Sequence, residues 1–112
     1  MLIYHNPKCS KSRATLKYIN EKGVSVDIIE YLKHPPTKQE LQSILEKLKM
    51  SPIDIVRVGE LLWKEHYANR ELSPEEVLNA IVKNPILLER PIVIDGDRAI
   101  IGRPPENVLA LL

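Results

Sequence analysis

The amino-acid sequence predicts an α/β fold: a mixed sheet of four strands into which a group of helices is inserted. A strand–helix–strand pattern opens the chain, the middle carries three helix-start signals without a strand pattern, and the end returns to two strands and a helix. At 112 residues the chain has the size of one domain. We expect a core formed by residues 1–33 and 84–112, and a helical insertion over residues 34–83.

The opening segment has the pattern of a βαβ unit. Residues 2–4 (LIY) are apolar, with β-branched and aromatic members, and predict a short strand. A loop then leads to a helix over residues 10–22, and Gly23 stands where a helix C-terminal glycine belongs. Residues 26–31 (VDIIEY) predict the second strand. The connection between the two strands is expected to be a right-handed crossover.

Three N-cap signals mark the middle of the chain. Thr37 and Glu40 have the spacing of a capping box, directly after two prolines that break the chain. The stretches SPID (51–54) and SPEE (73–76) place serine at the N-cap, proline at the first helical position and an acid three residues after the serine. Because no strand pattern separates these signals, the sequence predicts that this insertion is helical.

The last segment predicts a hairpin and a helix. Residues 90–102 (RPIVIDGDRAIIG) form two apolar runs around Asp95-Gly96, which is a strong hairpin signal. Residues 104–112 (PPENVLALL) supply a final helix. The resulting order, β-α-β, helices, β-β-α, matches a thioredoxin-like four-stranded mixed sheet with an inserted helical lobe.

Composition narrows the class of protein. The 16 basic and 15 acidic residues nearly balance, which gives no support for nucleic-acid binding. A single cysteine cannot form an internal disulfide, and no signal-peptide pattern or bilayer-length apolar run is visible. We therefore expect a soluble protein of the reducing cytoplasm, without a membrane partner. The three histidines are scattered and pair with no second cysteine, so no metal site is expected.

The only cysteine, Cys9, lies in the polar stretch HNPKCSKSR, just ahead of the first predicted helix. Unpaired N–H groups and the helix macrodipole favour the thiolate there. Lys8, Lys11 and Arg13, together with His5, add positive charge, and such settings lower a cysteine pKa to about 3.5–7.5. The alternative is a thiol merely tolerated at the surface, but the strand–cysteine–helix context favours a nucleophile.

Ser12 occupies the second cysteine position of a C-x-x-C spacing. With no resolving thiol in the chain, any disulfide step needs an outside thiol, such as glutathione or a partner protein. Ser12 either donates a hydrogen bond to the thiolate or is an ordinary residue of the first helical turn, and the sequence leaves both open. A cysteine-phosphatase loop is excluded, because its arginine position is occupied by Thr15.

Four stretches together resemble the arsenate reductase family of the glutaredoxin-dependent, thioredoxin-fold type (the ArsC/Spx-like superfamily). They cover nearly the whole chain: IYHNPKCSKSRATL at 3–16, YLKHPP at 31–36, NPILLERPIVI at 84–94 and GRPPENVL at 102–109. In that family the cysteine after His-Asn-Pro-x attacks the oxyanion, and the resemblance assigns this role to Cys9.

The resemblance also implies the residues that surround the nucleophile. The family's oxyanion-binding arginines map onto Arg90, Arg103 and Arg57, and guanidinium forks suit a tetrahedral oxyanion. Pro91 takes the place of the cis-proline that thioredoxin-like folds carry before the third strand. His5 and Ser12 remain as the residues expected to support the thiolate.

Three functions are compatible with these features. In the first, an enzyme without a bound cofactor, Cys9 attacks arsenate, glutathione acts as co-substrate and a glutaredoxin resolves the mixed disulfide. In the second, a glutathione-dependent thiol reductase acts on another substrate. In the third, a non-enzymatic module binds a protein partner as the Spx-type regulators do, although Ser12 removes the C-x-x-C switch typical of them.

Overall fold

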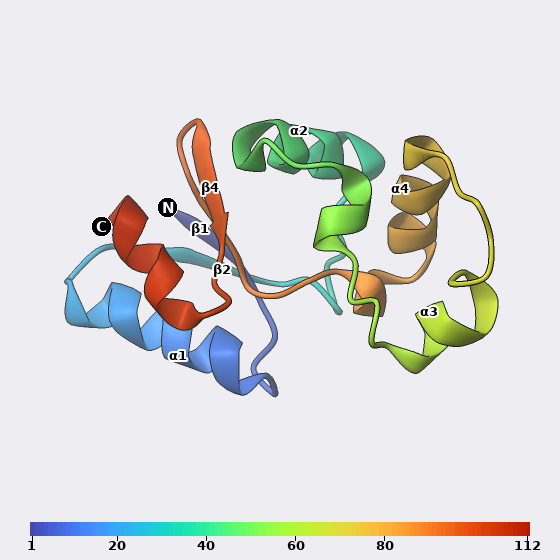
Figure 1. Ribbon diagram of the computed structural model, residues 1–112. Coiled ribbons are helices and arrows are strands. Elements are labelled where there is room, and N and C mark those ends of the chain that lie inside the picture. Colours follow the sequence, from blue (N-terminus) through green and yellow to red (C-terminus); the bar gives the residue numbers. More distant parts are fainter. The chain divides into compact units, whose positions relative to one another are not determined.

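The computed structural model describes residues 1–112 (Figure 1). Contacts divide the chain into two compact units, one formed by Met1–His34 and Arg90–Leu112 and the other by Pro35–Glu89. None of the helices has the length and apolar character needed to cross a membrane. In chain order the elements are β1 (Leu2–His5), α1 (Ser10–Glu21), β2 (Asp27–Glu30), α2 (Lys38–Leu48), the 3-10 helix η1 (Pro52–Ile55), α3 (Leu61–His66), α4 (Pro74–Lys83), the 3-10 helix η2 (Pro85–Leu87), β3 (Ile92–Asp95), β4 (Arg98–Ile101) and the 3-10 helix η3 (Pro105–Leu111).

The first unit contains one four-stranded sheet with the order β2-β1-β3-β4. β1 runs parallel to β2 and antiparallel to β3, and β3 pairs antiparallel with β4. The sheet is therefore mixed, with a βαβ unit followed by a hairpin and a helix. This arrangement confirms the predicted fold class.

α1 and η3 pack against the sheet within this unit and close its core (Figure 1). Ile3 and Val93 are paired across β1 and β3, so their side chains project to the same face. There they meet Ile19 of α1 and Val108 and Leu111 of η3 in one buried cluster. Each such aliphatic side chain stabilises the fold by about 1.5–3 kcal/mol when it leaves water.

The turns of the first unit follow the glycine signals of the sequence. α1 ends at Glu21, Lys22 is its C-cap residue, and Gly23 follows with a positive φ of 69°. The hairpin turns at Gly96, whose φ is 62°, with Asp95 and Arg98 as the last paired residues. The final helix, predicted over 104–112, is a 3-10 helix of seven residues, a longer run than this helix type usually forms.

The second unit is helical and includes residues 84–89, which the sequence analysis placed in the sheet-bearing core. Thr37 and Ser73 form complete capping boxes at α2 and α4, and the Ser51 N–H donates to Asp54 at 3.0 Å where η1 begins. η1 is a 3-10 turn of four residues, and α3 has no side-chain cap. In this second unit the fully buried side chains, each with an exposed fraction below 2%, are Leu41, Ile44, Ile55, Ile81, Leu87 and Leu88.

Candidate active site

Cys9 is the N-cap residue of α1 and ends the loop that follows β1. Asn6, which is buried, shapes this loop: its carbonyl accepts the Cys9 N–H at 3.0 Å and its side-chain Oδ1 accepts the Lys8 N–H at 3.0 Å. The thiol of Cys9 is partly exposed and free of any disulfide. Neighbouring backbone groups thus hold the sulfur at a helix N-terminus within reach of a reactant.

The pKa of Cys9 lies below its ordinary value. Burial alone raises the pKa, but hydrogen bonds from the Ser12 and Lys11 backbone N–H groups and the Arg90 side chain outweigh it, and the Arg90 charge lowers the pKa further. The sequence pointed to Lys8, Lys11 and Arg13, together with His5, as the source of positive charge. In the structure the cation that lowers the pKa of the thiol is Arg90, which comes from the far end of the chain.

His5 and Ser12 form a buried pair beneath the loop. Ser12 Oγ lies 2.6 Å from His5 Nδ1 and accepts the Asn6 N–H at 3.1 Å. Burial lowers the pKa of His5 and Arg13 lowers it further, while Glu30 raises it, and the net shift is downward. A neutral imidazole with its proton on Nε2 accepts the Ser12 hydroxyl hydrogen at Nδ1. The Ser12 hydroxyl therefore bonds His5 and the loop residue Asn6, and the Ser12 backbone N–H lowers the pKa of the Cys9 thiol.

Arg90 lies just before β3, and the Arg90–Pro91 peptide bond is cis. Burial lowers the pKa of Arg90, but the Tyr31 phenol and the Cys9 thiol raise it, and the net shift is upward. Two of its nitrogens, Nε and Nη1, are buried and have no hydrogen-bond acceptor in the protein. Buried donors without acceptors are rare in folded proteins and call for an explanation, such as a bound ion. Tyr31 was not among the residues expected from the sequence.

Because Gly102 has no side chain, Thr15 and Pro91 can lie close to its backbone, next to Arg90. A Cβ at Gly102 would lie 2.5 Å from Thr15 Oγ1 and 2.8 Å from Pro91 Cγ. The Gly102 N–H donates to the Pro91 carbonyl at 2.9 Å, which links β4 to the segment that carries Arg90. Thr15 and Gly102 were missed at the sequence level, because nothing local to either residue indicates the other.

Arg103 follows directly and packs against the same segment. Its Nη1 donates to the Arg90 carbonyl at 3.1 Å, and its own carbonyl accepts the Asn107 side-chain amide at 3.2 Å. The Arg103–Pro104 bond is also cis. Within the first unit the structure thus gathers Cys9, His5, Ser12, Arg90 and Arg103.

Arg57 belongs to the second unit. Its backbone N–H donates to the Leu87 carbonyl at 2.7 Å. Its guanidinium pairs with Glu60 at 3.2 Å and with Glu89 at 3.9 Å. Among the three predicted oxyanion-binding arginines, this one is paired with two carboxylates of its own unit.

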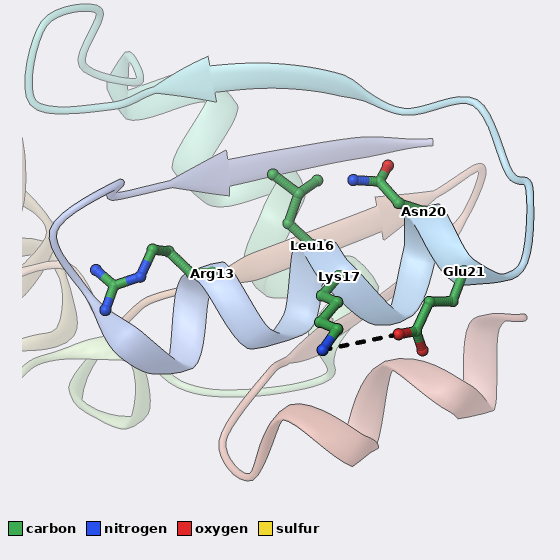
Figure 2. Close-up of a pocket in the computed structure, with 5 residues that line it drawn as sticks. All are labelled: Arg13, Leu16, Lys17, Asn20 and Glu21. Atoms are coloured by element: carbon green, nitrogen blue, oxygen red, sulfur yellow. Dashed lines mark ion pairs between the residues drawn. The ribbon is translucent and has the colours of Figure 1, made fainter.

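A surface hollow also runs along α1 (Figure 2). Figure 2 shows Lys17 and Glu21 paired one turn apart, with an Nζ–Oε1 distance of 3.9 Å. Arg13 stands at the end of the hollow nearer the start of α1, and its Nη1 donates to the Pro7 carbonyl at 2.9 Å. The residues that line the hollow include none of the predicted site residues; they are Arg13, Leu16, Lys17, Asn20 and Glu21.

Comparison with known proteins identifies the family. The sequence model of the ArsC family matches residues 4–111. The chain belongs to the ArsC family. It is 46% identical over 114 residues to the arsenate reductase of Haemophilus influenzae, covering 100% of this chain and 98% of that one. It is 44% identical over 112 residues to the arsenate reductase of Neisseria meningitidis, covering 98% and 96%.

A solved structure of an ArsC relative agrees in fold. The arsenate reductase from Vibrio cholerae superimposes with a TM-score of 0.94 at 40% identity, covering 99% of this chain and 96% of that chain. The sequence and structure comparisons together confirm the resemblance to the arsenate reductase family and the thioredoxin-like fold class predicted from the sequence.

Proposed function

We propose that this ArsC family member is an oxidoreductase that reduces arsenate, with Cys9 as the nucleophile and an external thiol as the reductant. One observation carries the proposal: the Cys9 thiol, whose pKa is lowered, lies beside Arg90, a cation with two buried donor nitrogens that lack a protein acceptor. A thiolate next to such donors suits attack on a bound oxyanion. The relatives named arsenate reductases support this choice of substrate.

The first step forms a bond between sulfur and arsenic. The Cys9 thiolate attacks the arsenic atom, an arsenic–oxygen bond breaks, and the oxygen leaves as water after taking up protons. Arg90 and Arg103 stabilise the charge of the oxyanion, with Arg57 as the third arginine of the proposal. The N–H groups of Ser12 and Lys11 keep Cys9 ionised before attack.

The electrons come from outside thiols, since the chain has one cysteine and cannot form its own disulfide. Glutathione, as co-substrate, attacks the arsenic centre and displaces a second oxygen as water. A glutaredoxin thiolate then attacks the glutathione sulfur. The bond between arsenic and the glutathione sulfur breaks, and its electron pair stays on arsenic, which becomes As(III). The mixed disulfide leaves, and water releases arsenite from Cys9. We infer that the protein works in a reducing compartment, the cytoplasm, and without a bound cofactor.

A coupled assay tests the proposal. Arsenite production is measured with arsenate, glutathione and a glutaredoxin, in parallel with a mixed-disulfide substrate and with Cys9→Ser as the blank. We expect Cys9-dependent arsenite formation. Arsenite formation no faster than in the Cys9→Ser blank would contradict the proposal, and turnover of the mixed disulfide alone would assign the protein to the thiol reductases acting on other substrates.

A further inference from the structure

The buried polar side chains of the protein gather around the cysteine loop. Apart from aromatic residues, the buried polar residues are His5, Asn6, Ser12 and Thr15. All four lie at the end of β1, in the loop or in the first half of α1. Because a buried polar group costs free energy unless it is hydrogen-bonded, each of them calls for a reason. Asn6 is the one that lies in the loop itself, and its exposed fraction is 7%.

Asn6 makes three hydrogen bonds that fix the backbone ahead of Cys9. Its side-chain Oδ1 accepts the Lys8 N–H at 3.0 Å, which is an Asx turn, in which a side chain replaces a backbone acceptor. Its carbonyl accepts the Cys9 N–H at 3.0 Å and closes a four-residue turn over residues 6–9. Its N–H donates to Ser12 Oγ at 3.1 Å and so attaches this turn to the first turn of α1. Only the first of these bonds depends on the amide side chain, so a substitution at Asn6 can remove it alone.

The position of the Cys9 sulfur depends on this turn. The sulfur is joined to the backbone through a single Cβ, so the backbone conformation of Cys9, with φ −93° and ψ 122°, limits where the sulfur lies. Cys9 is the N-cap residue, and an N-cap side chain faces the N–H groups of the first helical turn. Burial raises the pKa of this thiol, but the backbone N–H groups of Ser12 and Lys11 and the Arg90 side chain bring it below its ordinary value. A shift of the turn would move the sulfur relative to these donors.

We propose that Asn6 is a positioning residue for the nucleophile: its buried side-chain amide sets the turn that holds the Cys9 sulfur at the N–H groups of the first turn of α1. That this sulfur is a nucleophile rests on the proposed function, whereas its placement requires no substrate. The competing interpretation is that Asn6 only closes the loop and stabilises the fold, without an effect on the thiol.

The Asn6→Ala variant separates these interpretations. The thiolate absorbance of Cys9 is titrated against pH in the parent and in the variant, and the free energy of unfolding of both is measured in urea. The loss of one hydrogen bond corresponds to a three- to tenfold effect, so the Cys9 titration midpoint should rise by about 0.5–1 pH unit. The pH at which arsenate turnover is half-maximal should rise with it. A midpoint equal to that of the parent, whatever the free energy of unfolding, overturns the inference.

The substitution removes no charge, so a moved midpoint reports the turn and not a lost ion. The charged and titratable side chains that stay in place at this end of the sheet are His5, Lys8, Lys11, Arg13, Glu30 and Arg90. Asn20→Ala, at an exposed asparagine in the last turn of α1, is the matched control and should titrate as the parent does. If the parent does not reduce arsenate but Asn6→Ala still raises the midpoint, the proposed function fails and the positioning role stands.

A conservative variant tests whether the acceptor itself matters. Asn6→Ser keeps a hydroxyl oxygen that can accept the Lys8 N–H, although such turns are weaker than Asx turns. Its Cys9 midpoint should therefore lie between the midpoints of the parent and of Asn6→Ala. A serine midpoint no lower than the alanine midpoint overturns the inference.

A measurement on the parent covers the case in which neither variant folds. If the turn favours the thiolate, ionisation of Cys9 must favour the turn by the same factor, because coupling free energies are reciprocal. The protection of the Lys8 amide against hydrogen exchange is therefore compared below and above the Cys9 midpoint, with Cys9→Ser as the reference. We expect protection to rise by about three- to tenfold on ionisation in the parent and to stay constant in Cys9→Ser. Equal protection on both sides of the midpoint in the parent overturns the inference.

Discussion

The two compact units of the chain place arginines in opposite electrostatic settings. The unit that carries Cys9 contains nine lysines and arginines against six acidic residues, whereas the helical unit contains seven against nine. Residues 1–20 hold four cations and no acid. In the first unit Arg90 lies beside a thiol and keeps two buried donors without acceptors. In the second, Arg57 pairs with two carboxylates.

This difference shows that the local partners of an arginine, rather than its charge alone, decide what it can bind. Arg90 lowers the pKa of Cys9 and retains donors for an anion. An anion that approaches Arg57 competes with Glu60 and Glu89 for the same guanidinium. We therefore expect the binding energy for an oxyanion to come mainly from the cysteine-bearing unit.

Removing the thiol should have the largest effect. We expect Cys9→Ser to abolish arsenate turnover while circular dichroism remains unchanged, because the side chain is partly exposed and contributes little packing. The serine hydroxyl is not ionised near neutral pH and cannot replace the thiolate as nucleophile. Turnover that survives the substitution would remove Cys9 from the mechanism.

Truncating the arginines of the first unit should come next. A charge-assisted hydrogen bond contributes about 1.5–3 kcal/mol, so Arg90→Ala or Arg103→Ala should raise the apparent substrate constant by roughly tenfold or more. Lysine at either position should restore only part of the substrate affinity, because it keeps the charge but lacks the planar guanidinium fork. Arg98→Ala is the control, since Arg98 is an exposed cation of the hairpin. If all three alanine variants bind arsenate as tightly as the parent protein does, an oxyanion site in this unit is excluded.

A methyl group at Gly102 should loosen the segment that carries Arg90. Gly102→Ala places a Cβ against Thr15 and Pro91, and we expect the free energy of unfolding to fall by about 1–3 kcal/mol in urea denaturation. Gly59→Ala is the matched control, because a Cβ there meets no atom within 4 Å. Equal unfolding free energies for the two variants would show that the close approach at Gly102 does not matter.

Releasing Arg57 from Glu60, one of its two carboxylate partners, should have the smallest effect on arsenate binding. Glu60→Gln removes a charge from the partly exposed pair, in which the Arg57 side chain is 26% exposed. If Arg57 contributes to the site as proposed, arsenate should bind about two- to threefold more tightly, in line with the modest strength of such pairs. Glu46→Gln, on the exposed side of α2, should change nothing. Weaker binding in Glu60→Gln would mean that the pair positions Arg57 for the substrate instead of competing with it.

The sequence predicted the elements whose signals are local. The capping boxes at Thr37 and Ser73 and the glycines at 23 and 96 mark helix starts and turns within a few residues. α3 was not marked, because it begins at Leu61 after Glu60, whose side chain makes no cap hydrogen bond. The 3-10 form of η3 could not be distinguished either, since its apolar spacing fits both helix types.

The cysteine could be recognised from its position, but its electrostatic partners could not. Lys8 and Lys11 are its neighbours in the chain, yet Arg90 is the cation that lowers the pKa of its thiol. The approach of Arg90 to Cys9 depends on the pairing of β1 with β3, which no local pattern specifies. The pairing of strands that are distant in the sequence therefore determines which cation lies beside Cys9, and no local sequence pattern indicates that pairing.

The pairing of Cys9 with Arg90 is tested most directly by titrating the thiol in the parent and in Arg90→Ala. Thiolate absorbance, or the rate of alkylation by iodoacetamide, is followed across pH. We predict a parent midpoint below the ordinary value of about 8.5 and a higher midpoint in Arg90→Ala, with activity rising through the parent midpoint as the thiolate forms. A parent midpoint at the ordinary value, or one that Arg90→Ala leaves unchanged, would contradict the account.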